Sequence, residues 1–324
     1  MYPTKLSPSS GTFIKQQVDS LIKEGLNVKV IHIERDNKGL IEYFRMFFHL
    51  KIKVKNYNPD IIHCMYGGFM SYLVCKVISQ KKIIVSYCGA DLLGEPSTNI
   101  FKRFSIFFGV YFSRLSSKRA HKIIVKSKNL YDALPKSIDF KKVSIIPNGI
   151  DLNKFYPRNK KQCQANLNWD SKYFNILFPS TSGNHKVSLR KQLWLAEEAC
   201  EILKKNDIPF KLHKLEGIPH NEVPERINAS DCVLLTSKSE GSPNIIKEAM
   251  ACNTPVVSVD VGDVNERLKS IDNSFICEMN SNDISNKLSI VYANNRPSNG
   301  TNYIQELSAS KIAKKIEKIY LSLI

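Results

Sequence analysis

Short apolar runs alternate with amphipathic stretches of helical length along almost the whole chain. In the first half, runs rich in β-branched residues cover 27–33, 60–64, 82–88, 122–126 and 143–146. They return in the second half at 174–178, 210–215, 232–236 and 255–259. Near-continuous apolar strands separated by helices predict parallel sheets with helices on both faces.

A polar, proline-containing stretch at 147–173 separates the two series of strands. We therefore expect two doubly wound α/β domains, residues 1–155 and 156–307, that face each other across a cleft. The last amphipathic helix, 308–324, follows the second sheet and is a candidate to pack back on the first domain. Ligands of such sheets bind at the carboxyl ends of the strands.

The start of the chain departs from this plan. Residues 1–12 are polar and turn-like and lead directly into a helix from about Thr12. A doubly wound domain would normally begin with an apolar strand. We therefore expect the first strand of the N-terminal domain to be missing from this chain, or translation to start upstream.

Cysteine usage and hydropathy indicate a cytoplasmic protein. None of the eight cysteines is spaced as CxxC, so buried thiols in a reducing compartment fit better than a disulfide scaffold or a zinc ribbon. The opening residues do not resemble a signal peptide, and no apolar run reaches the roughly 20 residues of a membrane span.

The formal net charge of +17 is concentrated in the first half of the chain. Residues 1–150 contain 24 basic and 10 acidic side chains, and the basic segment 101–142 also carries many aromatic residues. Such a segment can lie on an anionic membrane, bind nucleic acid, or form a core helix with its aromatic side chains turned inward. Taken alone, the aromatic residues favour the core helix. The one-sided charge favours an anionic surface, and no nucleic-acid-binding motif is present.

The most informative segment is 236–257, where a buried strand leads through a small polar loop into a helix. A loop and helix N-terminus at the carboxyl end of a strand form an anion site, and Gly241 allows a ligand to approach the backbone. Asn244 is the expected N-cap residue. Glu240 and Glu248 flank this site, and their carboxylates suit sugar hydroxyls better than phosphate. Either glutamate alone would more often be a solvated surface residue.

This segment resembles the signature of the retaining glycosyltransferases of family 4, in which seven residues separate two glutamates. Other matching pieces occur in the same order, at 11–13, 59–63, 89–91, 146–151, 228–231 and 261–264. The similarity covers nearly the whole chain. It is closest in character to enzymes of bacterial surface polysaccharide assembly, such as the teichuronic acid group.

The resemblance implies a GT-B fold, in which two Rossmann-like domains hold a nucleotide-sugar mainly on the second. It places Glu240 on the donor sugar and Glu248 on the ribose. It implies that Lys191 and Lys186 neutralise the leaving diphosphate. The remaining implied donor contacts are Gly11, Arg190, Ser242, Pro243, Asn244 and Ile245. The implied acceptor-side residues are His63, Cys88 and Asp91, with Cys88 standing where the family often has histidine.

The implied reaction is metal-independent transfer with retention, without a cofactor. UDP is the expected nucleotide, and a lipid-linked saccharide at the inner face of the cell membrane is the expected acceptor. The basic first half would then dock peripherally on anionic lipid, and no nucleic-acid partner is expected. Two alternatives remain: a nucleotide-sugar epimerase on the same fold, or a non-catalytic basic binding protein.

Overall fold

The computed structural model of the chain describes residues 2–3, 11–32, 49–180 and 189–324. The chain divides into two compact units. Unit 1 comprises Met1–Asn148 and Ser310–Ile324, and unit 2 comprises Gly149–Ala309. Nearly all of the last helix therefore belongs to unit 1. The division after Asn148 falls at the beginning of the polar stretch that separates the two series of strands.

Unit 1 contains four parallel strands in the order β1-β2-β3-β4. They are β1 (Ile61–Cys64), β2 (Lys82–Tyr87), β3 (Lys122–Val125) and β4 (Val143–Ile145). The corresponding predictions from the apolar runs are confirmed. The inner strands β2 and β3 are almost completely buried, as expected of strands with helices on both faces.

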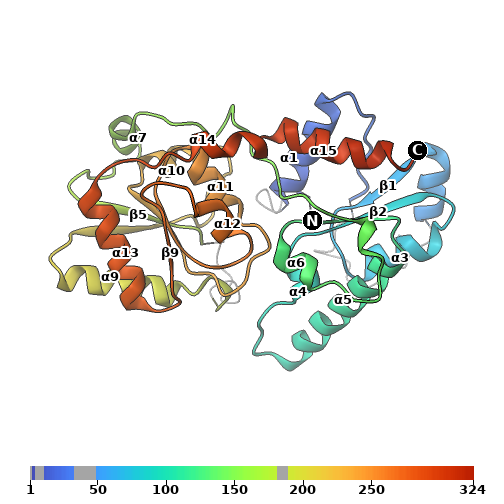
Figure 1. Cartoon of the computed structure of the whole chain (residues 1–324), viewed down its shortest axis with the longest axis horizontal. Helices are drawn as coiled ribbons and strands as arrows, with labels where there is room; N and C mark the ends of the chain where they lie inside the picture. The colour runs from blue at the N-terminus through green and yellow to red at the C-terminus, as the bar shows by residue number, and fades with distance from the viewer. Residues whose placement is uncertain (1, 4–10, 33–48, 181–188) are drawn as a thin grey trace. The chain divides into compact units, whose positions relative to one another are not determined.

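Helices cover both faces of this sheet (Figure 1). On one side lie α1 (Thr12–Lys23) and α15 (Ala309–Leu321), and on the other lie α3 (Phe69–Val77) and α5 (Ile100–Arg119). The shorter helices are α4 (Ala90–Leu93), α6 (Lys128–Asp132) and η1 (Phe140–Lys142). Residues 49–57 are also helical.

The strand predicted at 27–33 is wrong for the residues that the structure describes. Residues 27–32 form no strand, and Val30 and Ile31 are each 39% exposed. The physical reason is pairing, because an apolar run becomes a strand only where a neighbour completes its ladder of hydrogen bonds. Among the described residues, β1 is the first strand of the sheet.

The core-helix interpretation, which the aromatic residues favoured when taken alone, is wrong for most of the aromatic residues of α5. Phe101 is 82% exposed and Phe107 is 64% exposed, and Phe104, Phe108 and Tyr111 are exposed as well. The buried residues of α5 are three serines, Ser113, Ser116 and Ser117. Small side chains let α5 approach its neighbours closely, which leaves the bulky rings on its outer face. No helix in the described part of the chain combines the length and apolar character needed to cross a bilayer.

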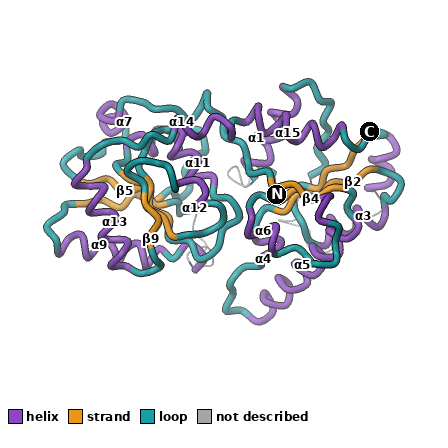
Figure 2. Tube along the Cα trace, in the orientation of Figure 1, coloured by secondary structure: helices purple, strands orange, loops and turns teal. Residues whose placement is uncertain are grey.

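Unit 2 contains five parallel strands in the order β6-β5-β7-β8-β9. They are β5 (Phe174–Phe178), β6 (Phe210–Lys214), β7 (Cys232–Leu235), β8 (Val256–Val259) and β9 (Phe275–Cys277). Figure 2 shows these strands gathered in one layer within the unit. The four predicted strands are confirmed. The edge strand β9 was not predicted from the sequence.

Helices also cover both faces of the sheet of unit 2 (Figure 1). One side carries α7 (Lys160–Asn166), α10 (Val223–Ala229), α11 (Asn244–Ala251) and α14 (Thr301–Ile304). The other side carries α9 (Leu193–Lys205) and α13 (Ser281–Asn294). The remaining short helices are α12 (Val264–Leu268) and η2 (Gln305–Leu307).

Candidate functional site

The loop that joins β7 to α11 lies at the carboxyl end of the sheet of unit 2. The Thr236 hydroxyl donates a hydrogen bond to the backbone oxygen of Lys191 at 2.8 Å, which ties this loop to the approach to α9. Helix α11 begins at Asn244, and Pro243 is its N-cap residue. The predicted N-cap position of Asn244 is therefore wrong by one residue, because proline with φ −67° already fixes the turn into the helix. The predicted phosphate-contact residues 242–245 surround this first turn, where backbone N–H groups are available to an anion.

Two cations hold the carboxylate of Glu240 in this loop. Its Oε1 atom lies 2.6 Å from Nη1 of Arg190 and 2.8 Å from Nζ of Lys191. Burial alone would raise the pKa of Glu240, but the charges of Lys191 and Arg190 outweigh it and hold the pKa below its ordinary value. Glu240 is therefore ionised at neutral pH and shares one small region with two positive charges.

The structure thus brings together three of the predicted site residues, Glu240, Lys191 and Arg190. The guanidinium of Arg190 also donates to the backbone oxygen of Ser239 at 3.1 Å, so the side chain spans the loop. A second anion bound near Glu240 would lie close to Arg190, to Lys191 and to the first turn of α11. Lys186, the other predicted cation, lies outside the described residues.

A buried network of polar side chains supports the loop between β7 and α11. The Ser242 hydroxyl donates to Asp263 at 2.9 Å, and the Lys247 ammonium donates to Ser242 at 2.9 Å. Arg267 completes the network with a 2.8 Å contact to Asp263. Ser242 is thus engaged through its side chain, which leaves its backbone N–H as the group for a ligand. Sequence alone did not indicate a role for Lys247, because a lysine inside a helix is usually solvated.

Close packing of two loops makes glycine necessary at position 262. Gly262 has φ +65°, a region that favours glycine. A Cβ atom there would lie 2.4 Å from the backbone oxygen of Gly241. The backbone of the donor loop is therefore fixed by contact with residues 261–264, which the resemblance had singled out without giving a reason.

The second predicted glutamate, Glu248, lies on α11 and is nearly buried. Its Oε1 lies 3.3 Å from Nε2 of His220, and Nδ1 of His220 lies 2.9 Å from Nζ of Lys154. Because a lysine ammonium can only donate, Nδ1 is the acceptor and Nε2 carries the proton that points to Glu248. His220 and Lys154 therefore orient the carboxylate of Glu248. Sequence reasoning missed both, since they lie 28 and 94 positions from Glu248 and belong to no local motif.

The acceptor-side predictions fall in unit 1, where Asp91 is a hub of backbone hydrogen bonds. Its carboxylate accepts the N–H groups of Gly67 at 2.8 Å, Cys88 at 3.0 Å and Gly89 at 2.8 Å. Burial raises the pKa of Asp91 despite these three bonds. Asp91 thus holds together the loops that follow β1 and β2. Both oxygens of its carboxylate accept these backbone hydrogen bonds.

His63 and Cys88 are held in the same region of unit 1. Nδ1 of His63 lies 2.6 Å from the Tyr320 hydroxyl, and Nε2 lies 2.7 Å from the Ser86 hydroxyl. Burial, aided by the charge of Lys126, lowers the pKa of His63 to about 3. Burial likewise raises the pKa of the Cys88 thiol to about 12. Both groups are neutral at physiological pH, and the two hydroxyls fix the ring of His63.

The low pKa of His63 predicts an acid-sensitive stability for unit 1. The unfolded chain has a histidine pKa of about 6.5, so below that pH the unfolded state binds a proton that the folded state rejects. The contribution of neutral His63 is complete above about pH 6.5 and decreases as the pH falls toward 3. We expect His63→Gln to remove up to about 2 kcal/mol of the stability difference between pH 7 and pH 5, measured by urea unfolding. His49→Gln, at an exposed histidine, is the control, and an unchanged pH dependence in His63→Gln would contradict the assignment.

Of the other predicted residues, Gly11 lies in unit 1 at the N-cap of α1 with φ 66°. The predicted donor-side residues all lie in unit 2: Arg190, Lys191, Glu240, Glu248 and 242–245. Among the described residues, no group of three or more His, Cys, Asp or Glu side chains is arranged to hold a metal ion.

Two family models match successive parts of the chain. The Glycosyltransferase Family 4 model matches residues 9–154, and the Glycosyl transferases group 1 model matches residues 195–319. Glu240 and Glu248 both fall within the second match.

Curated relatives and solved structures agree with these matches. A Bacillus subtilis protein named as a teichuronic acid biosynthesis glycosyltransferase, TuaC, is 24% identical over 330 residues, which covers 82% of this chain and 80% of that protein. The UDP-Gal:alpha-D-GlcNAc-diphosphoundecaprenol alpha-1,3-galactosyltransferase of Escherichia coli is 23% identical, covering 77% of this chain and 68% of that protein. Sucrose-phosphate synthase of Thermosynechococcus elongatus superposes with a TM-score of 0.74 at 16% identity, covering 96% and 92% of the two chains. The predicted fold class, two parallel-sheet α/β domains of GT-B type, is thereby confirmed.

Proposed function

The chain belongs to the family 4 and group 1 glycosyltransferases, and on that premise we propose that it transfers a sugar from a UDP-sugar to a lipid-linked saccharide in bacterial surface glycan synthesis. The observation that carries the proposal is the pairing of Arg190 and Lys191 with Glu240 beside the start of α11. Cations and free backbone N–H groups suit a diphosphate, and the adjacent carboxylate suits the sugar that the diphosphate carries.

In the proposed reaction, the bond between the anomeric carbon and the diphosphate oxygen breaks, and a bond to the acceptor oxygen forms on the same face. The acceptor proton passes to the departing phosphate oxygen, so the configuration is retained and no metal ion or cofactor takes part. Arg190 and Lys191 stabilise the charge that grows on the leaving oxygens. Glu240 contacts the donor sugar, and Glu248, oriented by His220, accepts hydrogen bonds from the ribose.

Binding of nucleotides tests the donor half of this proposal. Calorimetry with UDP, GDP and ADP should give binding for UDP alone, and Glu248→Gln should weaken it about tenfold, the loss of one or two hydrogen bonds to a charged group. Glu201→Gln, at an exposed glutamate on α9, should bind like the wild type. Binding of none of these nucleotides would refute the donor site. Conversion of a UDP-sugar without any acceptor would instead identify an epimerase.

The part of the proposal that concerns the lipid-linked acceptor rests on the distribution of charge. That distribution favours peripheral docking on the anionic inner face of the cell membrane. Unit 1 contains 28 basic and 11 acidic residues, whereas unit 2 contains 19 of each. The entire net charge of +17 therefore lies on unit 1. The same unit carries the exposed aromatic residues of α5, at positions 101, 104, 107, 108 and 111. Their spacing of three or four residues places them on one side of the helix, as in helices that lie in a membrane interface.

We expect the chain to float with anionic vesicles at low salt and to dissociate as salt screens the lysines and arginines. Phe101→Ser combined with Phe107→Ser should weaken binding at least about tenfold, because each ring buried in lipid contributes roughly 1.5–3 kcal/mol. Tyr303→Ser, at an exposed aromatic residue of unit 2, is the matched control. Flotation that is equal for all three proteins, or absent for the wild type, would contradict the membrane proposal.

A further inference from the structure

Helix α5 exposes one face to solvent and packs another against the rest of unit 1. Its exposed face, here called the aromatic face, carries the rings at positions 101, 104, 107, 108 and 111, which the proposed function places on the membrane. Its packed face contains three completely buried serines, Ser113, Ser116 and Ser117. Buried hydroxyls are normally hydrogen-bonded, and the partners of these three serines differ.

Ser113 joins α5 to the loops that follow β1 and β2. Its hydroxyl donates to the backbone oxygen of Asp91 at 2.6 Å and accepts the N–H group of Gly68 at 2.7 Å. Gly68 is the N-cap residue of α3 and ends the loop after β1, whereas Asp91 lies in α4, just after β2. A hydroxyl can donate and accept at the same time. One side chain of α5 therefore holds two segments that are separate in the sequence.

The carboxylate of Asp91 extends this connection through both loops. It accepts the backbone N–H groups of Gly67, Cys88 and Gly89. Gly67 also packs directly on α5, because a Cβ atom there would lie 2.5 Å from Oγ of Ser113. The two loops are thus bonded to each other through Asp91 and to α5 through Ser113.

The other two buried serines have different partners. The hydroxyl of Ser117 donates to the backbone oxygen of Arg114 at 2.8 Å, within α5 itself. The hydroxyl oxygen of Ser116 lies 2.7 Å from that of Tyr87 and 3.0 Å from that of Ser71 on α3. Ser117 is therefore a buried serine of the same helix whose hydroxyl bonds to neither loop, which makes it a matched control.

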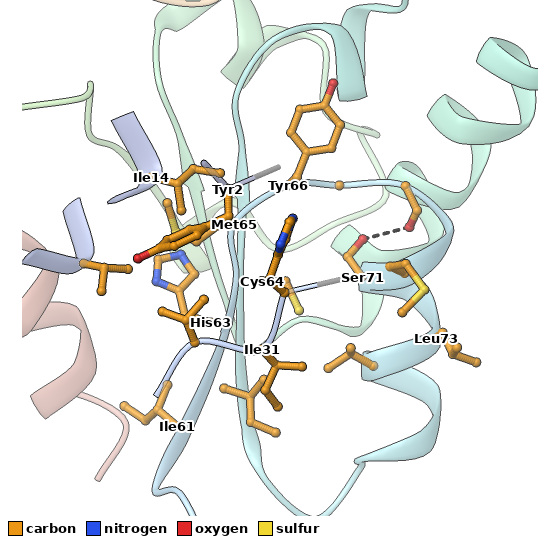
Figure 3. A pocket seen from close by; sticks show the side chains of 18 of the residues that line it. Tyr2, Ile14, Ile31, Ile61, His63, Cys64, Met65, Tyr66, Ser71 and Leu73 are labelled. Atoms are coloured by element: carbon orange, nitrogen blue, oxygen red, sulfur yellow. Dashed lines mark hydrogen bonds between the residues drawn. The ribbon is translucent and has the colours of Figure 1, made fainter. Parts of the chain in front are cut away.

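The two loops and α5 line one cavity of about 2030 Å³ in unit 1. Figure 3 shows this cavity, with Met65 and Tyr66 of the first loop and Ser71 of α3 among the residues that line it. Asp91 lines it from the second loop, and Phe108 of the aromatic face lines it from α5. Ligands of parallel sheets bind at the carboxyl ends of the strands, where both loops begin. The cavity therefore adjoins both the loops that would meet an acceptor and the helix that would meet the lipid.

We propose that Ser113 is a positioning residue that couples lipid contact at the aromatic face of α5 to the acceptor-side loops 65–68 and 88–91. This inference rests on the proposed membrane docking of α5 and names the residue through which that docking reaches the acceptor side. Lipid contact uses the rings of α5 together with the lysines and arginines of unit 1, so a state in which α5 has moved away from the unit binds lipid less well. Lipid therefore makes that movement rarer. Loops that Ser113 holds are released when α5 moves, so they open less often on the membrane that carries the acceptor.

Hydrogen exchange of the loop amides tests this coupling, measured by mass spectrometry with and without vesicles of phosphatidylglycerol and phosphatidylcholine. With lipid at about ten times the concentration for half-maximal binding, peptides covering 65–68 and 86–91 of the wild type should exchange about tenfold more slowly. Ser113→Ala should bind the vesicles equally well but lose this slowing. Ser117→Ala should match the wild type in both respects. A purely structural defect would speed exchange by the same factor with and without lipid, and so would leave the slowing unchanged.

The possible outcomes separate this inference from the proposed function. Slowing that persists in Ser113→Ala, or that is absent from a wild type bound to vesicles, would overturn the coupling and leave the membrane docking intact. A wild type that does not bind the vesicles would overturn both, and UDP binding would then decide the donor site separately. Ser113→Cys is the second variant if alanine prevents folding, because a thiol fills similar space with weaker hydrogen bonds. It should show less slowing than the wild type, and full slowing would contradict the proposal.

Discussion

Lys191→Ala is expected to lower kcat for sugar transfer by about two to three orders of magnitude, the effect of removing one preorganised group that stabilises developing charge. Lys191 is largely buried, its backbone oxygen is anchored by Thr236, and its ammonium lies 2.8 Å from Glu240. It is therefore placed before the substrate arrives and needs little rearrangement. Because the charge on the leaving diphosphate grows toward the transition state, kcat should fall more than KM rises.

Initial rates at several UDP-sugar concentrations measure this effect. Lys238→Ala is the matched control, since Lys238 lies between β7 and α11, in the loop of Glu240, with an exposed side chain. That variant should stay within about twofold of the wild type, as is usual for exposed positions. A Lys191→Ala enzyme with unchanged kcat, or one no worse than Lys238→Ala, would remove Lys191 from the leaving-group role.

Glu240→Gln is expected to lower transfer about a hundredfold while tightening the binding of UDP about fivefold. The two effects have opposite signs because, in the proposed site, Glu240 contacts both the donor sugar and the cations Arg190 and Lys191. Toward the sugar it offers a carboxylate, which glutamine replaces poorly. Toward Arg190 and Lys191 it is a competing anion, and its removal leaves both cations to the diphosphate.

The pH dependence of UDP binding supplies a second test of Glu240. Its pKa is depressed, so the carboxylate remains ionised well below the ordinary range and its ion pairs are lost only as the pH falls further. Binding of UDP should therefore show no transition from Glu240 between pH 5 and pH 8. Weaker UDP binding in Glu240→Gln than in the wild type would contradict the competing-anion role. Glu201→Gln again serves as the control for loss of a distant charge.

Local patterns predicted the parts of the molecule that depend on local physics. The runs at 82–88 and 122–126 became buried strands because β-branched apolar residues suit a sheet covered on both faces. The loop before Asn244 was recognisable because a strand, a glycine and a proline in succession leave few alternatives for the backbone. Periodicity could not reveal that residues 27–32 form no strand. The strand with which a segment pairs lies elsewhere in the sequence, so a local pattern does not show whether it is present.

Side-chain partners in the site were less accessible to prediction. Arg190 and Lys191 are neighbours in sequence, and only the fold brings both to Glu240, fifty and forty-nine positions away. In the same way, His220 contacts Glu248 and Lys154 contacts His220, from two loops with no motif of their own. The aromatic residues of α5, taken alone, favoured a core helix, because sequence alone did not show that three serines form its packed face.

The sequence by itself determined most of the succession of strands and helices, the concentration of positive charge in the first half, and the loop and helix that carry Glu240 and Glu248. These follow from residue type and spacing, which act over a few positions of the chain. Only the tertiary structure decided which cations meet Glu240 and which groups hold His63 and Asp91. The contacts of Glu240, His63 and Asp91 join segments far apart in the chain, and they exist only after the sheets and helices have packed.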